Sequence, residues 1–334
     1  MGRQISRTRH HNTLVTLNDI IEAQTRLRGV AVRTRLIPWS VQDAGRSLYL
    51  KPENQQPIGA FKLRGAYNKI ASLRPEEYSR GVITYSSGNH GQGVAYAARA
   101  LGIKAVIVMP NNIPPIKRNA TAALGAEIVT VGPGSLERQA KAEALAARHG
   151  YVIVPPFNDE KIIAGQGTMA LEILEDLPDV ETVLVPVGGG GMLSGVATAI
   201  KLSKPEVKVI GVEPELAADA QASFRSGKIV ELSAEEVSRT IGDGLRTQSL
   251  GPITFEHIRK YVDDIVTVSE DEIRQAVQRL AANPKTVAEP SGAVAVAAFL
   301  FRKNELPAAR RNVAVISGGN IEPQMLREIS QVGA

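Results

Sequence analysis

The stretch "ETVLVPVGGGGMLSG" (residues 181–195) decides the fold class, because a continuous apolar run leads directly into four glycines and then into a helix-forming segment. A strand that is apolar at every position is buried on both faces, which is typical of a parallel sheet covered by helices. Each of the first seven strand-like runs of this chain is followed by a predicted helix. The sequence therefore predicts an α/β protein with mostly parallel sheets. The eight runs lie at 81–85, 104–110, 126–132, 151–157, 181–191, 208–214, 263–269 and 311–320.

The domain organisation follows from the order of these runs. A chain of 334 residues is long enough for two lobes. Four consecutive strand–helix units predict a small domain over 80–158, and the segments 1–79 and 159–334 then form the large domain. Ligands of such sheets bind beyond the carboxyl ends of the strands.

Composition excludes several classes of protein. The 39 Lys and Arg residues are scattered among 34 Asp and Glu residues, so a nucleic-acid partner is not expected. The chain has no cysteine, which excludes disulfides and thiolate chemistry and fits a cytoplasmic location. The longest apolar stretch, 293–301, is too short to cross a bilayer, and 1–12 reads as a disordered basic tail. We expect no membrane partner.

Polar and glycine-rich segments follow several of the predicted strands. "SSGNHGQG" (86–93) is a strand-to-helix turn, and the simpler interpretation is an anion-binding cap. The four glycines at 188–191 are entropically costly and suggest a phosphate cradle. Leu193 and Ser194 stand where the dinucleotide fingerprint requires glycine, and no Gly-Lys-Ser/Thr follows as in a Walker loop. A monophosphate without a nucleotide fits best.

A lysine completes this pattern. "GAFKLRGAYNKI" (59–70) places Lys62 at the start of a predicted helix, where the helix dipole and an apolar wall disfavour its charged form. A lysine that is readily neutral, together with a phosphate loop, suits pyridoxal phosphate, whose aldehyde needs an amine.

These segments resemble those of a known family. "GAFKLRGA", "SSGNHGQG", "AGQGT" (164–168), "PVGGGGMLSG", "GDGL" (242–245), "AEPSGAVAVAA" (288–298) and "SGGN" (317–320) occur in the order found in the fold-type II pyridoxal-phosphate enzymes. The chain is similar, from about Leu17 onward, to the branch of serine racemases and serine/threonine dehydratases. The resemblance implies the two-lobe fold of the tryptophan synthase β-like enzymes, a small amino acid as substrate and a homodimer.

The resemblance also implies a role for each matching residue. Lys62 would be the Schiff-base lysine, and Ser87 the acid/base group on the opposite face of the ring. The other implied cofactor contacts are Phe61 beside the ring, Asn89 at the 3′-oxygen, Gly188, Gly189, Gly190, Gly191 and Met192 at the phosphate, Ser317 at the pyridine nitrogen, and Gly244 and Glu289 along the ring. The implied substrate contacts are Ser86, Ser87, Asn89 and His90 at the carboxylate, and Arg138.

The implied activity is β-elimination from a β-hydroxy amino acid of the L-threonine or L-serine type, which yields a 2-oxo acid and ammonia. The alternatives are a 3-hydroxyaspartate dehydratase, a serine or aspartate racemase, and a non-catalytic binder. Tyr85 and "PPF" (155–157) differ from the residues that mammalian-type racemases have at these positions. The alanine at position 60 is similar to the residue found in the hydroxyaspartate dehydratases and in some serine/threonine dehydratases.

A divalent cation is also expected. Glu213, Ala217 and Asp219 match in spacing the racemase-branch site, in which two carboxylates and a backbone carbonyl bind Mg²⁺ or Ca²⁺. In the alternative interpretation Glu213 caps a helix and Asp219 is a solvated surface residue.

Overall fold

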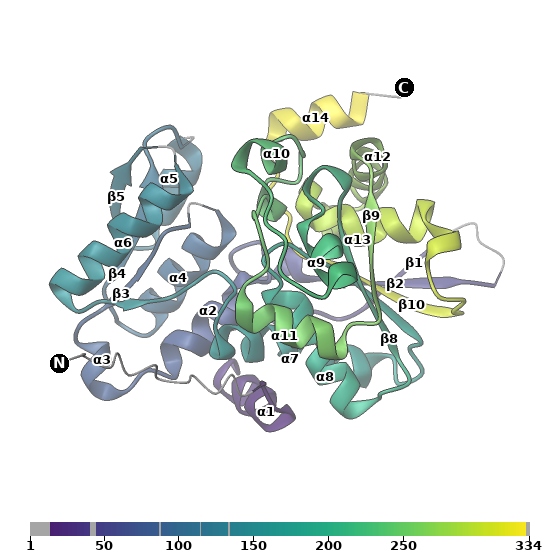
Figure 1. Cartoon of the computed structure of the whole chain (residues 1–334), viewed down its shortest axis with the longest axis horizontal. Coiled ribbons are helices and arrows are strands. Elements are labelled where there is room, and N and C mark those ends of the chain that lie inside the picture. The colour runs from purple at the N-terminus through teal and green to yellow at the C-terminus, as the bar shows by residue number, and fades with distance from the viewer. Residues whose placement is uncertain (1–13, 41–44, 87, 114, 133, 332–334) are drawn as a thin grey trace, which may run out of the picture.

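The protein contains two β-sheets, each covered by helices (Figure 1). The computed structural model describes residues 14–40, 45–86, 88–113, 115–132 and 134–331. A six-stranded sheet has the order β1-β2-β10-β7-β8-β9, and a four-stranded sheet has the order β5-β4-β3-β6. Every described pairing is parallel except β1 with β2. The predicted α/β class with mostly parallel sheets is confirmed.

The secondary-structure elements have the following bounds. The strands are β1 (Ile37–Trp39), β2 (Ser47–Pro52), β3 (Val82–Thr84), β4 (Ala105–Pro110), β5 (Glu127–Val131), β6 (Val152–Ile153), β7 (Thr182–Pro186), β8 (Lys208–Pro214), β9 (Asp264–Val268) and β10 (Arg311–Ile316). The α-helices are α1 (Leu17–Arg26), α2 (Lys62–Ala71), α3 (Pro75–Tyr78), α4 (Asn89–Ala100), α5 (Pro115–Ala123), α6 (Ser135–His149), α7 (Glu160–Asp176), α8 (Gly191–Ser203), α9 (Asp219–Ser226), α10 (Ala234–Ser238), α11 (Pro252–Tyr261), α12 (Glu270–Leu280), α13 (Pro290–Phe301) and α14 (Pro323–Gln331). The short 3₁₀ helices are η1 (Glu53–Gln55), η2 (Glu215–Ala217), η3 (Asp243–Leu245), η4 (Pro284–Thr286) and η5 (Lys303–Glu305).

The large sheet is buried on both faces because successive side chains of a strand point to opposite sides. On β7, Val183 and Val185 pack with α1, α7, α8 and α11, whereas Leu184 packs with α12 and α13 on the other side. Helix α13 is apolar around its whole circumference and almost entirely buried, as expected for a helix inside a core. The carboxyl ends of β7, β8 and β10 therefore have fixed positions.

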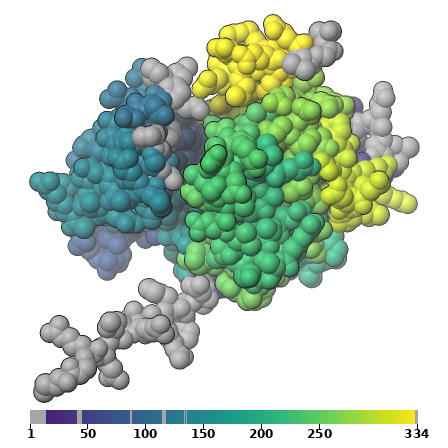
Figure 2. All heavy atoms as spheres, turned by 45° about the horizontal axis from the view of Figure 1, so that its top comes forward, coloured from purple at the N-terminus to yellow at the C-terminus, as the bar shows by residue number. Residues whose placement is uncertain are grey.

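The small sheet has its own apolar clusters. Val82 and Ile107 pack with α4 on one face, and Ile83 and Val106 pack with α6 on the other. Helix α2 lies between the two sheets, since its Ala66 belongs to the first of these clusters (Figure 1). Figure 2 shows a hollow between the blue-to-teal surface of the small sheet and its helices and the green surface of the larger body. The predicted domain bounds stay a prediction.

Two departures from the sequence prediction have physical causes. The expected strand at 151–157 is only two residues long, because Pro155 and Pro156 have no N–H group to donate to a neighbouring strand. Strands β1 and β2 were not expected: β1 is a short antiparallel edge strand, and β2 carries the buried cation Lys51. No helix in the described ranges is both long and apolar enough to traverse a bilayer.

Candidate active site

Lys62 is the first residue of α2, and the end of β10 fixes its position. The backbone N–H of Phe61 donates to the carbonyl of Ser317 (3.0 Å), and Ala60 pairs with Gly318 in an isolated β-bridge. The lysine segment thus continues the large sheet beyond the carboxyl end of β10, which is where ligands of parallel sheets bind.

The side chain of Lys62 is partly buried among apolar groups. Its Nζ donates to the carbonyl oxygen of Pro156 (2.7 Å) and lies 5.2 Å from the centroid of the Phe61 ring. Burial lowers the pKa of Lys62 from 10.5 to about 8. The amine is therefore much more readily available in its neutral, nucleophilic form than that of a solvated lysine.

Helix α2 is anchored two residues after Lys62 by a buried ion cluster that was not predicted from the sequence. Arg64 Nε donates to Glu53 (2.8 Å), and Arg64 Nη1 donates to Glu172 on α7 (2.7 Å). Lys51 on β2 also pairs with Glu172. All these side chains are buried, so the cluster holds the start of α2 against both β2 and α7.

The glycine loop connects β7 to α8 and is rich in unpaired donors. Gly190 has φ +92°, a left-handed conformation that favours glycine. Within the described part of the chain, no acceptor faces the amide N–H groups of Gly188 to Met192. A run of free amides at the amino terminus of a long helix can hold an anion such as a phosphate.

Neighbouring side chains press against this loop and explain its glycines. A Cβ on Gly189 would lie 2.3 Å from Cδ1 of Phe157, and one on Gly190 would lie 2.9 Å from Thr254. The hydroxyl of Thr254 on α11 donates to the carbonyl of Gly189 (2.7 Å). Because Phe157 follows Pro156 directly, Lys62 and the glycine loop contact the same dipeptide. Phe157, Thr254 and Pro156 have no motif of their own and were not predicted as site residues.

Four further predicted cofactor contacts lie around the end of β10. Glu289 is the residue before α13, and its Oε1 accepts a hydrogen bond from Asn89 Nδ2 (2.6 Å). The Ser317 hydroxyl is buried and donates over 3.4 Å to the carbonyl of Ser291, and the Ser291 hydroxyl accepts from the N–H of Gly244 (2.8 Å). The structure therefore gathers Asn89, Gly244, Glu289 and Ser317 beside the segment that carries Lys62.

The predicted substrate contacts lie on the small-sheet side. Ser86 follows β3, and His90 is buried on α4 with Nε2 donating to the carbonyl of Val154 (3.0 Å). Burial and the nearby Lys62 charge lower the pKa of His90 to about 3, so its ring is neutral and only its backbone N–H can meet a carboxylate. Arg138 is half-buried on α6, where burial lowers its pKa. Ser87 lies outside the described residues, and its predicted role stays a prediction.

The predicted metal ligands form a separate buried group at the end of β8. The carboxylate of Glu213 accepts from the backbone N–H groups of Ala220 (3.2 Å) and Gln221 (2.6 Å), so it does cap α9. Asp219 is fully buried, however, and neither of its carboxylate oxygens has a hydrogen-bond partner within the described residues. Burial raises the pKa of Asp219 to about 7, and burial together with the Asp219 charge raises that of Glu213.

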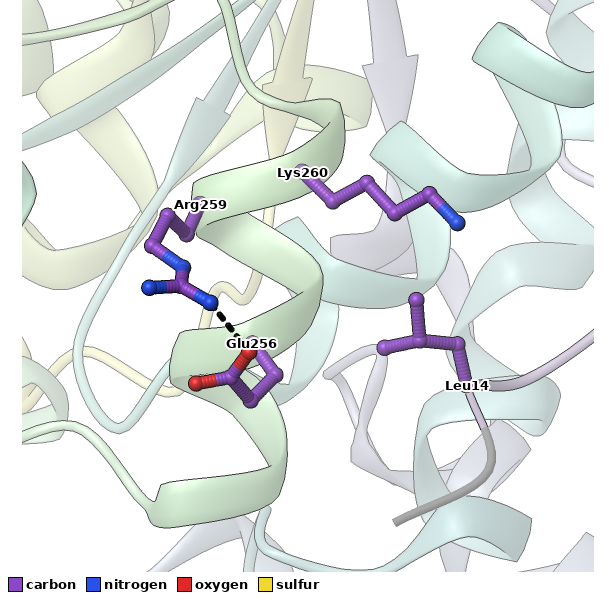
Figure 3. Close-up of a pocket in the computed structure, with 4 residues that line it drawn as sticks. All are labelled: Leu14, Glu256, Arg259 and Lys260. Atoms are coloured by element: carbon purple, nitrogen blue, oxygen red, sulfur yellow. Dashed lines mark hydrogen bonds and ion pairs between the residues drawn. The ribbon is translucent and has the colours of Figure 1, made fainter.

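One surface pocket lies elsewhere. Its lining residues are Leu14 from the amino-terminal segment and Glu256, Arg259 and Lys260 on α11; Figure 3 shows Lys260 extending on the side of Leu14, with Glu256 and Arg259 pointing toward each other. Arg259 already pairs with Glu256 (2.8 Å), and no predicted site residue lines the pocket. It is not the candidate active site.

The donor set fits pyridoxal phosphate. It has a lysine with a lowered pKa, a loop of backbone amides that meet no acceptor within the described residues, and polar groups between the two. The fold and the site together define a class of protein: an α/β enzyme with a lysine and a phosphate-binding glycine loop for one cofactor. The family described as "Pyridoxal-phosphate dependent enzyme" matches residues 27–318, and the chain belongs to this family.

The chain is also similar over most of its length to relatives of known activity. An L-threonine ammonia-lyase from Thermotoga maritima is 49% identical over 96% of this chain and 79% of that protein. An L-threo-3-hydroxyaspartate ammonia-lyase from Saccharomyces cerevisiae is 41% identical over 92% of this chain and 94% of that protein. The solved structure of maize serine racemase superposes with a TM-score of 0.90 at 36% identity, over 95% of this chain and 97% of the racemase.

Proposed function

We propose that this protein is a pyridoxal-phosphate-dependent ammonia-lyase that converts L-threonine to 2-oxobutanoate and ammonia. The observation that carries the proposal is the 49% identity to the L-threonine ammonia-lyase, which spans nearly the whole chain and includes the segments of Lys62 and the glycine loop. L-serine is the expected second substrate, because it has the same β-hydroxyl group with one methyl group fewer.

Each predicted contact has a chemical task in this proposal. The amides of Gly188, Gly189, Gly190, Gly191 and Met192 would hold the phosphate, and Phe61, Gly244 and Glu289 would line the ring. Asn89 would donate to the 3′-oxygen, and the Ser317 hydroxyl would serve the pyridine nitrogen. The amides that follow β3, including those of Ser86 and His90, bind the substrate carboxylate, and Arg138 lies on the substrate side.

The bound cofactor supplies an electron sink for the electron pair that remains when the α-proton leaves. Lys62 is the base for this proton, because burial keeps its amine easily neutral and the Pro156 carbonyl orients Nζ. A serine hydroxyl at the pyridine nitrogen donates less strongly than a carboxylic acid would, which favours loss of the β-hydroxyl over transamination. The β-hydroxyl takes up a proton and leaves as water, and a water molecule then hydrolyses the resulting imine to the 2-oxo acid and ammonia.

A second activity has its own support. The 41% identity to the L-threo-3-hydroxyaspartate ammonia-lyase and the alanine at position 60 make a 3-hydroxyaspartate dehydratase the second candidate. A racemase needs a group on the ring face opposite Lys62, and Ser87 is the proposed residue. The 36% identity to maize serine racemase makes this the weaker alternative.

A substrate panel tests the proposal. Purified protein loaded with pyridoxal phosphate is assayed with L- and D-serine, L-threonine, and threo- and erythro-3-hydroxyaspartate, and 2-oxo acid and enantiomer are followed together. We expect the highest kcat/KM with L-threonine and loss of turnover in Lys62→Ala. The matched control is Lys69→Ala, because Lys69 is a lysine of the same helix whose side chain pairs with Asp159. A higher kcat/KM for 3-hydroxyaspartate would replace the leading activity with the second one.

A divalent cation, Mg²⁺ or Ca²⁺, is proposed at Glu213, Ala217 and Asp219. The support is the unpartnered buried carboxylate of Asp219, whose burial is costly unless a cation or a proton neutralises it. Carboxylate and carbonyl oxygens suit a hard cation, and within the described residues no cluster of three or more His, Cys, Asp or Glu offers an alternative. Such an ion would stabilise the loop after β8 without contacting the substrate.

The assembly and location are also proposals. We propose a homodimer in the cytoplasm, as the family resemblance implies, with lobes divided at 80–158. Light scattering on the eluted protein gives the mass directly, and a monomer at micromolar concentration would contradict the dimer.

A further inference from the structure

The side chain of Asn320 connects the lysine segment to the predicted cofactor contact Asn89. Asn320 is the last residue of "SGGN" and follows β10. Its Nδ2 donates to the backbone carbonyl of Ile58 (2.9 Å) and to Oδ1 of Asn89 (2.8 Å). None of the roles considered above uses this residue.

These contacts determine which end of each amide faces which neighbour. The carbonyl of Ile58 can only accept, so it requires the NH₂ end of Asn320. The second hydrogen of that NH₂ group then points at Asn89, which must present its oxygen. The Asn89 NH₂ group consequently faces the opposite way, where one of its hydrogens is donated to the Glu289 carboxylate (2.6 Å). The orientation of Asn89 is thus held from two sides, by the Glu289 carboxylate and, through Asn320, by a backbone carbonyl.

Asn320 itself is held in place by close packing. Gly59 has φ +72°, and a Cβ at that position would lie 2.4 Å from Asn320 Oδ1. The N–H of Gly319 donates to the carbonyl of Gly59 (2.9 Å), which fixes the loop against the lysine segment. The amide of Asn320 therefore has little freedom to turn over.

The same bonds connect the two sheets. Asn89 is the first residue of α4, which covers the small sheet, whereas Glu289 precedes α13, which packs on the large sheet, and Asn320 follows β10 of that sheet. A substitution of Asn320 would accordingly remove a hydrogen bond between α4 and the segment that follows β10.

We propose that Asn320 is a positioning residue that directs an N–H of Asn89 toward the 3′-oxygen of the cofactor. The inference rests on the proposed cofactor site and adds a residue that acts on the cofactor only through Asn89. Without Asn320, only the Glu289 carboxylate still holds the Asn89 amide in this orientation, so the amide is less firmly fixed and presents its N–H to that site less often.

The variants Asn320→Ala and Asn320→Asp separate positioning from a merely structural role. Alanine removes the restraint on Asn89. Aspartate replaces the donor with acceptors that face the Ile58 carbonyl and the Asn89 oxygen, and so favours the wrong orientation of Asn89. The control is Asn54→Ala, because Asn54 also donates to two backbone carbonyls nearby, Lys285 (3.1 Å) and Val287 (3.0 Å), but does not contact Asn89.

The readout is the dissociation constant of pyridoxal phosphate from the apoprotein, measured by absorbance, with the urea midpoint of each apoprotein as a check on folding. One hydrogen bond of about 1 kcal/mol corresponds to about a fivefold weakening in Asn320→Ala. We expect a larger weakening in Asn320→Asp and none in Asn54→Ala. In an Asn89→Ala background, Asn320→Ala should have no further effect, because the residue it positions is gone.

Additive effects of Asn89→Ala and Asn320→Ala would overturn the inference, as would unchanged affinity in Asn320→Ala. If Asn320→Asp fails to fold, the cycle of alanine variants still decides. Wild-type apoprotein that does not bind pyridoxal phosphate would refute the proposed function itself, whereas normal wild-type binding with an additive cycle would refute only the role of Asn320.

Discussion

Replacing Asp219 with asparagine should stabilise the protein when no divalent cation is present. Asp219 is fully buried, its carboxylate oxygens have no hydrogen-bond partner within the described residues, and its pKa is raised from 3.8 to about 7. A pKa that is higher in the folded state favours folding at low pH, and this contribution is lost as pH rises from about 4 through about 7. Metal-free protein should therefore lose stability over this range.

The magnitude follows from the two pKa values. At pH 8 the difference between 3.8 and about 7 corresponds to about 4 kcal/mol of destabilisation. Asparagine removes the charge but leaves a buried amide without a recorded partner, which costs about 1–3 kcal/mol. The net gain of Asp219→Asn at pH 8 is then about 1–3 kcal/mol. At pH 5 Asp219 is already largely protonated, so the gain should vanish or change sign.

The assay is urea unfolding of chelator-treated protein at pH 5 and pH 8, with and without Mg²⁺ or Ca²⁺. The cation should raise the midpoint of the wild type at pH 8 and leave Asp219→Asn unchanged. Asp271→Asn, an exposed residue on α12, serves as the control and should show neither effect. If chelated Asp219→Asn were no more stable than the wild type at pH 8, or if the cation stabilised both equally, the reasoning would be refuted.

Three other perturbations follow from the site. Because burial lowers the pKa of Lys62 to about 8, about a quarter of its amine is neutral at pH 7.5, against about 0.1% at an ordinary pKa of 10.5. In stopped-flow mixing of apoprotein with pyridoxal phosphate, the rate of cofactor attachment should therefore rise up to about pH 8 and then level. A rate that continues to rise past pH 10 would contradict this. Gly189→Ala should cost about 1–3 kcal/mol by overlap with Phe157 and weaken cofactor binding, so an unchanged urea midpoint and affinity would argue against the close packing. Arg64→Met should cost about 3–5 kcal/mol because it leaves the buried Glu53 without its arginine and Glu172 with Lys51 alone, and a loss below 1 kcal/mol would show that the cluster is not a buried ion network.

Much of the fold could be predicted because its strands are locally recognisable. All eight predicted runs contain strands, since an uninterrupted apolar run bounded by glycine or proline has few other solutions. The start of α2 at Lys62 also matches the prediction. Strand β2 escaped prediction because its buried Lys51 reads as a surface residue until the carboxylates that pair with it are known. Only tertiary contacts supply that information.

The residues of the candidate site could also be predicted only in part. Lys62 and the glycine loop stand out in the sequence because each carries its chemistry within a few residues. The contacts of Phe157 with Gly189 and of Asn320 with Asn89 join residues 32 and 231 positions apart in the chain, so no local pattern announces them. The burial of Asp219 belongs to this second group, because its neighbours in sequence allow a surface position equally well.

Lys62 is the attachment point of the cofactor in the proposed mechanism, and one measurement tests this role directly. Protein loaded with pyridoxal phosphate should be yellow, and reduction with borohydride should bleach the colour and fix the cofactor covalently. Peptide mapping by mass spectrometry should then find the pyridoxyl group on the peptide that contains Lys62, and Lys62→Ala should carry no adduct after the same treatment. An adduct on another lysine, or a Lys62→Ala variant that keeps both the colour and full turnover of L-threonine, would contradict the account.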